Sequence, residues 1–241
     1  MDKIVYISGK VENGKIATEI TDQKIADLIA SKKIVIIKNL FTAQQMLELR
    51  TSVFEWGKTT PLATTDDFRS NYHSRKAKVS NIQQSPHVFH DYNFNNFSKL
   101  PDSLNKKMFS VFDSLRIFYN SLTHNTAELG VIKNKHYFHP QLIQYPEGGG
   151  FFGRHNHNLL PQKIGFILAL SKFGTDYKAG GTCFEIDNEL VSLEGLHDIG
   201  DLCLWHYDLD HWVSQSPLNN WFNWDSDKGR WVATLAYFNP F

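Results

Sequence analysis

The sequence is poor in cysteine, in long apolar runs and in net charge. Its two cysteines, Cys183 and Cys203, each lie within an apolar run that resembles a strand. Buried free thiols in a reducing compartment are therefore expected, rather than a disulfide-stabilised secreted fold. No stretch approaches the roughly 20 apolar residues that cross a membrane, and the N-terminus lacks the charged and apolar regions of a secretory signal. A cytoplasmic protein without a membrane partner is expected.

The lack of a net charge also argues against nucleic acid as a partner. The chain has 25 Lys and Arg against 25 Asp and Glu, so its formal net charge is zero. Proteins that bind nucleic acid usually carry a basic excess that neutralises phosphates, and no such partner is expected here. What the chain does have is aromatic residues: 18 Phe, 9 Tyr and 6 Trp among 241 residues. This composition and length indicate one globular domain, spanning residues 1–241.

The first half of the chain is predicted to be mixed and mostly helical. Residues 22–31 and 102–123 carry apolar side chains at helical spacing, and residues 34–37 form a β-branched run suited to a buried strand. Thr42 and Gln45 form a capping box that predicts the start of a further helix.

Residues 59–100 are polar and show no clear period. We expect an irregular loop, of the kind that often serves as a lid or a substrate loop. His73, His87 and His90 fall within it and are interpreted as ordinary surface or loop histidines. The basic piece at residues 69–78 is interpreted as solvated.

The second half changes character. Its segments are short, apolar or alternating, and turn-forming residues such as Pro146, Gly180 and Gly229 separate them. The segments are residues 141–145, 164–170, 181–186, 201–205 and 231–238. Several short strands at this spacing predict a barrel or sandwich, and we expect a β-barrel flanked by the helices of the first half.

The segment from Tyr145 to Asn158 contains the strongest chemical signal. Alternate side chains of a strand share a face, so His155 and His157 are expected to point the same way and to contribute to a metal site. His211 is the best candidate for a third ligand from a distant strand. The glycines at 148, 150 and 153 match a dinucleotide-binding fingerprint formally, but they do not open a helix after a first strand and are interpreted as turn residues.

Four motifs occur in an order that resembles a known family. They are residues 145–158, Gly181-Thr182-Cys183-Phe184-Glu185, residues 200–213 and residues 229–238. Together they resemble the Fe(II)- and 2-oxoglutarate-dependent dioxygenases, in particular the prolyl-hydroxylase-like branch. The resemblance implies an α+β fold with a double-stranded β-helix, a jelly-roll or cupin-like barrel. Residues 141–241 would form its metal-binding core, and residues 1–140 would supply helical support, the first strands and the polar loop.

The resemblance also implies a role for each matching residue. His155 and His211 would bind Fe(II), and His157 stands where the family carries Asp or Glu. Arg230 would bind the far carboxylate of 2-oxoglutarate through its planar guanidinium, and Tyr145 and Thr234 could assist. The expected activity is oxidation by molecular oxygen, most often hydroxylation, of a small-molecule or amino-acid-like substrate.

Two departures from the family pattern leave alternatives open. With His157 in place of a carboxylate, the centre would be one unit more positive; His206 could rival His211, and Asp208 or Asp210 could supply a carboxylate or orient His211. His211 and Arg230 also lie 19 positions apart, more than the family's usual gap, so residues 214–228 must form an inserted aromatic loop. This loop either covers the active site or packs on the barrel.

Two other functions fit the same residues. Three histidines on one metal are also found in oxygenases that activate oxygen on a directly bound substrate without 2-oxoglutarate, although Arg230 argues against this class. Alternatively, the chain could be a degenerate, non-catalytic metal or ligand binder. The sequence does not reveal the substrate, the position oxidised or the oligomeric state.

Overall fold

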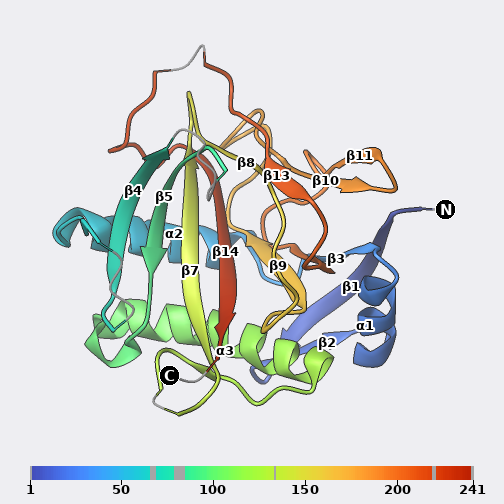
Figure 1. Cartoon of the computed structure of the whole chain (residues 1–241). Coiled ribbons are helices and arrows are strands. Elements are labelled where there is room, and N and C mark those ends of the chain that lie inside the picture. The colour runs from blue at the N-terminus through green and yellow to red at the C-terminus, as the bar shows by residue number, and fades with distance from the viewer. Residues whose placement is uncertain (1, 66–68, 79–84, 133, 219–220, 240–241) are drawn as a thin grey trace.

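A computed structural model describes residues 2–65, 69–78, 85–132, 134–218 and 221–239. The first half contains β1 (Ile4–Glu12), β2 (Lys15–Thr18), α1 (Asp22–Ala30), β3 (Ile34–Lys38), α2 (Ala43–Thr59), β4 (Tyr72–Lys78), β5 (His87–Asn93), the 3₁₀ turn η1 (Phe97–Lys99), α3 (Asp102–Thr123) and β6 (Glu128–Leu129). The second half contains β7 (Tyr137–Pro146), β8 (Phe151–His155), β9 (Ile164–Ala169), β10 (Thr182–Ile186), β11 (Glu189–Ser192), β12 (Leu202–His206), β13 (His211–Val213) and β14 (Gly229–Phe238) (Figure 1).

The predicted helices are confirmed, and so is the local chemistry that begins one of them. Thr42 accepts a hydrogen bond from the backbone N–H of Gln45, and the Gln45 side chain accepts one from the backbone N–H of Thr42. This reciprocal capping box begins α2 where the sequence predicts it. In α3, the side chains at helical spacing are buried, as a core-facing helix requires. Both cysteines are buried and free, as expected.

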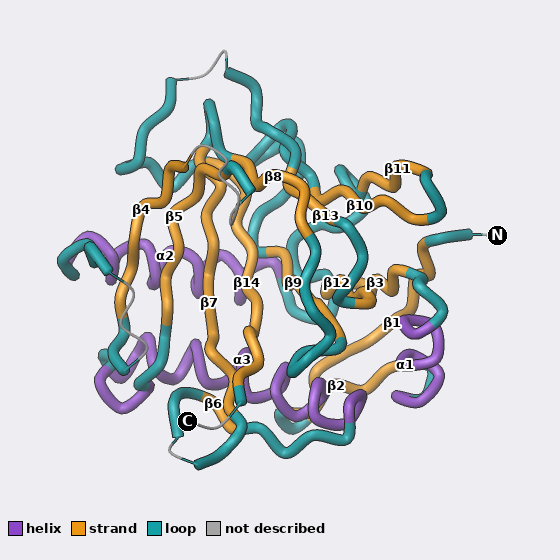
Figure 2. Tube along the Cα trace, in the orientation of Figure 1, coloured by secondary structure: helices purple, strands orange, loops and turns teal. Residues whose placement is uncertain are grey.

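The described strands form one 14-stranded sheet that curves into a double-stranded β-helix, which confirms the predicted fold class (Figures 1 and 2). The strand order is β11-β10-β13-β8-β5-β7-β14-β9-β12-β3-β1-β2, with β4 on β5 and β6 on β7. The longest pair is β7 with β14, which run antiparallel from the pair Pro146–Gly229 to the pair Tyr137–Phe238. Strands β8 and β13 lie side by side, with His155 directly opposite His211.

Successive side chains of β7 and β14 point to opposite faces of the sheet. One face packs against the helices, and the other faces a cavity. Leu142 and Trp231 belong to the main hydrophobic core, which also includes the buried faces of α2 and α3. The intervening residues Tyr145 and Arg230 line a cavity inside the barrel instead. The helices therefore support one face of these strands and leave the opposite face available for chemistry (Figure 1).

The expectation of an irregular loop over residues 59–100 is wrong. Strands β4 and β5 pair with each other, and β5 also pairs with β7 and β8, so this segment is part of the barrel wall. His73, His87 and His90 are not loop histidines; all three are buried on these strands. The first half also supplies the β1–β2 hairpin, which the sequence reading did not include.

The described part of the 214–228 insertion packs on the outside of the barrel. The Trp224 ring lies 6.3 Å from the His90 ring, and Gln144 donates hydrogen bonds to the carbonyls of Ser226 and Lys228. His90 and Gln144 are cross-strand partners on the face opposite Tyr145. Of the two expectations for this loop, packing on the barrel is the one its described residues follow.

Candidate metal centre and co-substrate cavity

Three imidazoles converge where β8 and β13 meet. One ring nitrogen each from His155, His157 and His211 lies within 4.8 Å of the other two. His155 ends β8 and His211 begins β13, while His157 lies just beyond the end of β8 rather than within the strand. Among the described residues, this is the only group of three or more potential ligands that lies close enough to hold one ion.

Backbone carbonyls fix the tautomers of two of these histidines. Nδ1 of His155 lies 2.8 Å from the carbonyl oxygen of Gly153, and Nδ1 of His211 lies 2.9 Å from that of Leu209. Because a carbonyl oxygen can only accept, each Nδ1 carries the proton and each Nε2 keeps its lone pair. The His157 ring is held differently, stacked on Tyr207 at a centroid distance of 4.2 Å.

All three histidines are held in the neutral state that a metal ligand requires. Burial and, to a lesser extent, the neighbouring His155 lower the pKa of His211 to about 3. Burial and His155 likewise lower the pKa of His157 to about 4, and burial lowers that of His155. At neutral pH each ring therefore has one nitrogen without a proton, and a metal ion can bind there without displacing a proton.

The rival ligands lie outside the cluster. Nδ1 of His206 is hydrogen-bonded to the Asp208 carboxylate, which also pairs with Lys32. Asp210 accepts hydrogen bonds from Arg154 and Asn156 and does not contact the Nδ1 of His211. Neither carboxylate belongs to the group that could hold the ion.

Arg230 lies in the same cavity as the three histidines and is only 4% exposed. Its Nη2 donates a 2.6 Å hydrogen bond to the Thr182 hydroxyl. Its charge also opposes the rise that burial causes in the pKa of Tyr177. Among the described residues, no carboxylate forms an ion pair with it. A buried guanidinium without a counter-ion is costly, so the site is suited to an anionic ligand.

The other two predicted co-substrate residues also line this cavity. The Tyr145 ring lies 5.6 Å from the Arg230 guanidinium, and burial raises the pKa of Tyr145 to about 12, so its phenol stays protonated. The Thr234 hydroxyl donates to the carbonyl oxygen of Phe166 at 2.9 Å, which leaves its oxygen lone pairs rather than its proton toward other partners.

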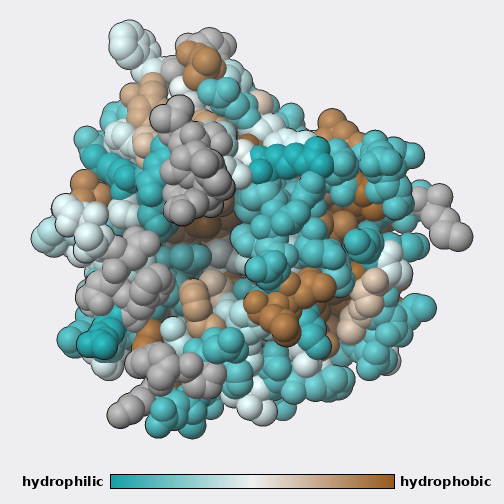
Figure 3. Space-filling model, in the orientation of Figure 1, coloured by the Kyte–Doolittle hydropathy of each residue, from teal (hydrophilic) through white to brown (hydrophobic). Residues whose placement is uncertain are grey.

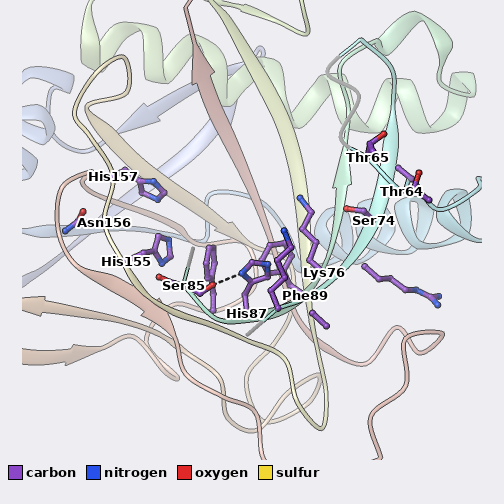
Figure 4. Close-up of a pocket in the computed structure, with 15 residues that line it drawn as sticks. Thr64, Thr65, Ser74, Lys76, Ser85, His87, Phe89, His155, Asn156 and His157 are labelled. Carbon is purple, nitrogen blue, oxygen red and sulfur yellow. Dashed lines mark hydrogen bonds between the residues drawn. The ribbon is translucent and has the colours of Figure 1, made fainter. Parts of the chain in front are cut away.

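The barrel encloses a cavity of about 160 Å³, and a wider cleft of about 770 Å³ adjoins it at His155 and His157. Figure 4 shows these two histidines on one side of the cleft and His87, Phe89 and Lys76 on the other. Figure 3 shows that the face of the molecule seen in Figure 1 is mostly hydrophilic and is hollowed near its centre. The inner cavity has room for a molecule of a few carbon atoms, and the cleft has room for a larger one.

The residues present fit Fe(II) and 2-oxoglutarate. Imidazole is a common ligand of non-haem iron, and two histidines of the cluster, His155 and His211, have their Nδ1 atoms held by backbone carbonyls, which leaves each Nε2 lone pair for a metal ion. A dicarboxylate that reached the cluster with one end would meet Arg230 with the other, since both line one small cavity. The donor set is three nitrogens, with no protein carboxylate in it.

Comparisons with known proteins agree with this fold. No family model matches the chain, and no curated protein matches it in sequence. Among solved structures, a prolyl-4-hydroxylase from Pseudomonas putida is similar over 92% of this chain and 100% of its own, with a TM-score of 0.58 and 12% identity. A 2OG-Fe(II) oxygenase family oxidoreductase from Burkholderia pseudomallei is similar over 96% of both chains, with a TM-score of 0.54 and 9% identity. EctD from S. alaskensis, solved with bound Fe, is similar over 97% of this chain and 83% of its own, with a TM-score of 0.55 and 13% identity.

These likenesses define the class of fold. The chain has the double-stranded β-helix of the 2OG-Fe(II) oxygenases, as the sequence resemblance predicted. Within this fold, the three-histidine cluster and Arg230 are the residues of this chain that fit a metal ion and an anionic ligand. No described helix is long and apolar enough to span a membrane.

Sequence reasoning missed several residues that complete the site. Thr182 accepts a hydrogen bond from Arg230, and Tyr177 is close enough for the charge of Arg230 to affect its pKa. Tyr207 stacks on His157, and the Trp205 ring lies 5.3 Å from the His211 ring. Alternation could have pointed to Thr182 and Trp205, because both lie on predicted strands. No sequence signal places Tyr177, which comes from the connection between β9 and β10.

Proposed function

We propose that this protein is an Fe(II)- and 2-oxoglutarate-dependent oxygenase that oxidises a small molecule, with hydroxylation as the most common outcome of such chemistry. Arg230 carries the proposal: it is a buried cation without a carboxylate partner among the described residues, and it shares one small cavity with three neutral histidines. A co-substrate with two carboxylates satisfies both ends of that cavity.

Each side chain has a definite task in this proposal. His155, His157 and His211 hold the metal, and Arg230 holds the far carboxylate of 2-oxoglutarate in an ion pair that Thr182 orients. The protonated phenol of Tyr145 can donate to the same carboxylate. Bound iron supplies the activation of molecular oxygen, coupled to the oxidative decarboxylation of 2-oxoglutarate to succinate. The substrate enters by the wider cleft, which adjoins the histidines.

The binding of 2-oxoglutarate tests the proposal before any substrate is known. Calorimetry on protein loaded with Ni(II), which does not turn over, should detect 2-oxoglutarate binding. Arg230→Ala should weaken that binding by about 100-fold or more, because it removes two charge-assisted hydrogen bonds. The metal content of the variant should not change. If 2-oxoglutarate fails to bind the metal-loaded wild-type protein, the proposal is wrong.

The three-histidine donor set favours a second candidate, an oxygenase that binds its substrate directly to the metal and does not use 2-oxoglutarate. Such an enzyme would be insensitive to Arg230→Ala and would consume oxygen without forming succinate. A third candidate is a degenerate, non-catalytic metal or ligand binder, and the variant His157→Asp distinguishes it from the two oxygenases. A gain of succinate formation in that variant would indicate degeneracy, whereas loss of an existing activity would show that the imidazole is required.

A further inference from the structure

The three candidate metal ligands are not held equally firmly. His155 and His211 are cross-strand partners, and the Nδ1 of each donates to a backbone carbonyl. His157 lies beyond the end of β8, and no described residue forms a hydrogen bond with either of its ring nitrogens. Only packing therefore opposes a change in the side-chain rotamer of His157.

The backbone that carries His157 is also weakly held. Residues 157–161 lie between β8 and β9, and among the described residues no hydrogen bond involves their backbone. The side chains of Asn156 and Gln162 anchor the two ends of this segment by hydrogen bonds. Between these anchors, a change of backbone conformation breaks no hydrogen bond, which is typical of segments that open locally at low cost.

One aromatic ring outside the cluster holds His157 in place. The Tyr207 ring stacks on the His157 ring with a centroid distance of 4.2 Å and an interplanar angle of 14°. The backbone N–H of Tyr207 donates to the carbonyl of Lys163, and its ring packs against the hydrophobic cluster that includes Phe184 and Trp205. Tyr207 is thus fixed to the barrel. An aromatic pair of this kind contributes about two- to tenfold to an equilibrium constant, so the position of His157 depends on one contact of modest strength.

His157 also lies where the two cavities of the site meet. It lines both the inner cavity of about 160 Å³ that contains Arg230 and the cleft of about 770 Å³ (Figure 4). His211 is buried and lines the inner cavity alone, whereas the His157 side chain is only partly buried. A coordination position that His157 leaves is therefore accessible to a small molecule in the cleft.

We propose that His157 is an exchangeable ligand of the metal centre and that Tyr207 is the positioning residue that keeps it bound. His155 and His211 form the permanent pair. When the His157 ring turns away from Tyr207, an oxygen or nitrogen donor of a small molecule in the cleft takes its place. This inference rests on the metal site of the proposed function and not on the use of 2-oxoglutarate.

Electron paramagnetic resonance of Cu(II)-loaded protein tests the role of Tyr207, because the superhyperfine pattern counts the imidazole nitrogens bound to the metal. The wild-type protein and Tyr207→Phe, which keeps the ring, should both show mainly three nitrogens. Tyr207→Leu removes the stack and should raise the ratio of two-nitrogen to three-nitrogen signal by about two- to tenfold. The matched control is Tyr237→Leu, which removes a tyrosine stacked on His136 away from the metal centre and should leave the ratio unchanged. A loss of overall stability alone does not change this ratio in the folded, metal-loaded protein.

Metal affinity tests the inequality of the three ligands. Co(II) affinity, measured by chelator competition, should fall at least about tenfold less in His157→Ala than in His155→Ala or His211→Ala. Free imidazole added to Cu(II)-loaded His157→Ala should restore the third nitrogen, because the vacated position is accessible from the cleft.

Three results would each overturn the inference. They are a wild-type signal with two nitrogens, an unchanged nitrogen ratio in Tyr207→Leu, and equal losses of Co(II) affinity in the three histidine variants. If Tyr207→Leu does not fold, the comparison of His157→Ala with His155→Ala decides.

The outcomes also separate this inference from the proposed function. A protein that binds 2-oxoglutarate and holds all three histidines equally firmly retains the oxygenase function and has no exchangeable ligand. A protein with an exchangeable His157 that does not bind 2-oxoglutarate has the inferred metal site and not the proposed chemistry.

Discussion

At the scale of single residues, Thr182 provides a test of how Arg230 is held. Thr182→Val removes the hydroxyl while keeping the β-branched shape, so one guanidinium N–H loses its acceptor. We expect the free energy of unfolding to fall by about 1–3 kcal/mol and 2-oxoglutarate to bind about three- to tenfold more weakly. Urea unfolding and calorimetry measure the two effects. Thr182→Ser should restore both, and unchanged values in Thr182→Val would show that Thr182 does not orient Arg230.

The sequence predicts the candidate ligands of this site better than the residues that orient them. A motif and an alternation predict His155, His157, His211 and Arg230, which line one cavity. They do not single out Thr182, because a threonine on a strand is common and its partner Arg230 lies 48 positions away. Such long-range polar pairs depend on how strands are arranged in space, which a local sequence pattern does not reveal.

At the scale of elements, prediction worked where one face of the element is apolar. The helices were predicted because their buried faces repeat at helical spacing. Strands β4 and β5 were missed because their inward-facing side chains are polar: Ser74 and Asp91, for example, are buried and hydrogen-bonded to each other. A strand that lines a polar cleft has no hydrophobic alternation to detect. The β1–β2 hairpin was missed although Asn13-Gly14, a common hairpin turn, lies between its strands.

The strands that carry the histidines are joined by a cluster of charged side chains. Arg154, next to His155, donates to Asp210, next to His211, and also forms a bidentate pair with Glu185 on β10. Asn156 donates to Asp210 as well. These contacts link the neighbouring strands β10, β13 and β8 beside the metal centre. They also occupy the carboxylate of Asp210, which precedes His211 in the sequence.

Loss of this link should loosen the histidine cluster without unfolding the barrel. Arg154→Gln is expected to weaken Co(II) binding by about tenfold, since residues that orient metal ligands typically contribute that much or more. Chelator competition measures the affinity. Arg116→Gln, which breaks a comparable pair with Asp113 on α3, is the matched control and should leave Co(II) affinity unchanged. Equal affinities in all three proteins would contradict the positioning role of Arg154.

For the inserted loop, residues 214–228, we expect substitutions to affect stability and not the binding of metal or 2-oxoglutarate. Trp224 packs near His90 and Arg75 on the outer face, and no described residue of the loop lines the cleft or the inner cavity. Trp224→Ala should therefore lower the free energy of unfolding by about 1 kcal/mol while leaving metal and 2-oxoglutarate affinities within about twofold. A large loss of 2-oxoglutarate affinity in this variant would mean that the loop acts on the site.

At the scale of the whole molecule, the two halves of the chain form one sheet, since β3 pairs with β12 and β5 pairs with β7 and β8. When these strands, which are rich in aromatic residues, become buried on folding, histidine side chains become buried with them. Burial lowers the pKa of several histidines well below the ordinary value of 6.5: His90, His197 and His211 to about 3, and His139 and His157 to about 4. These histidines are neutral in the folded protein but become charged in the unfolded chain below pH 6.5.

The metal-free protein should therefore lose stability as the pH falls from about 7 to 5. In this range the unfolded state binds more protons than the folded state, so the free energy of unfolding decreases by up to about 1.4 kcal/mol per pH unit for each such histidine. Model-peptide pKa values place histidine within this range, so the slope reports mainly on the histidines. Urea unfolding at pH 7, 6 and 5 measures it, and His197→Gln should reduce the slope by about one proton. Stability that stays constant over this range would show that the buried imidazoles acquire protons without unfolding, and that the barrel interior is more accessible to water than its packing indicates.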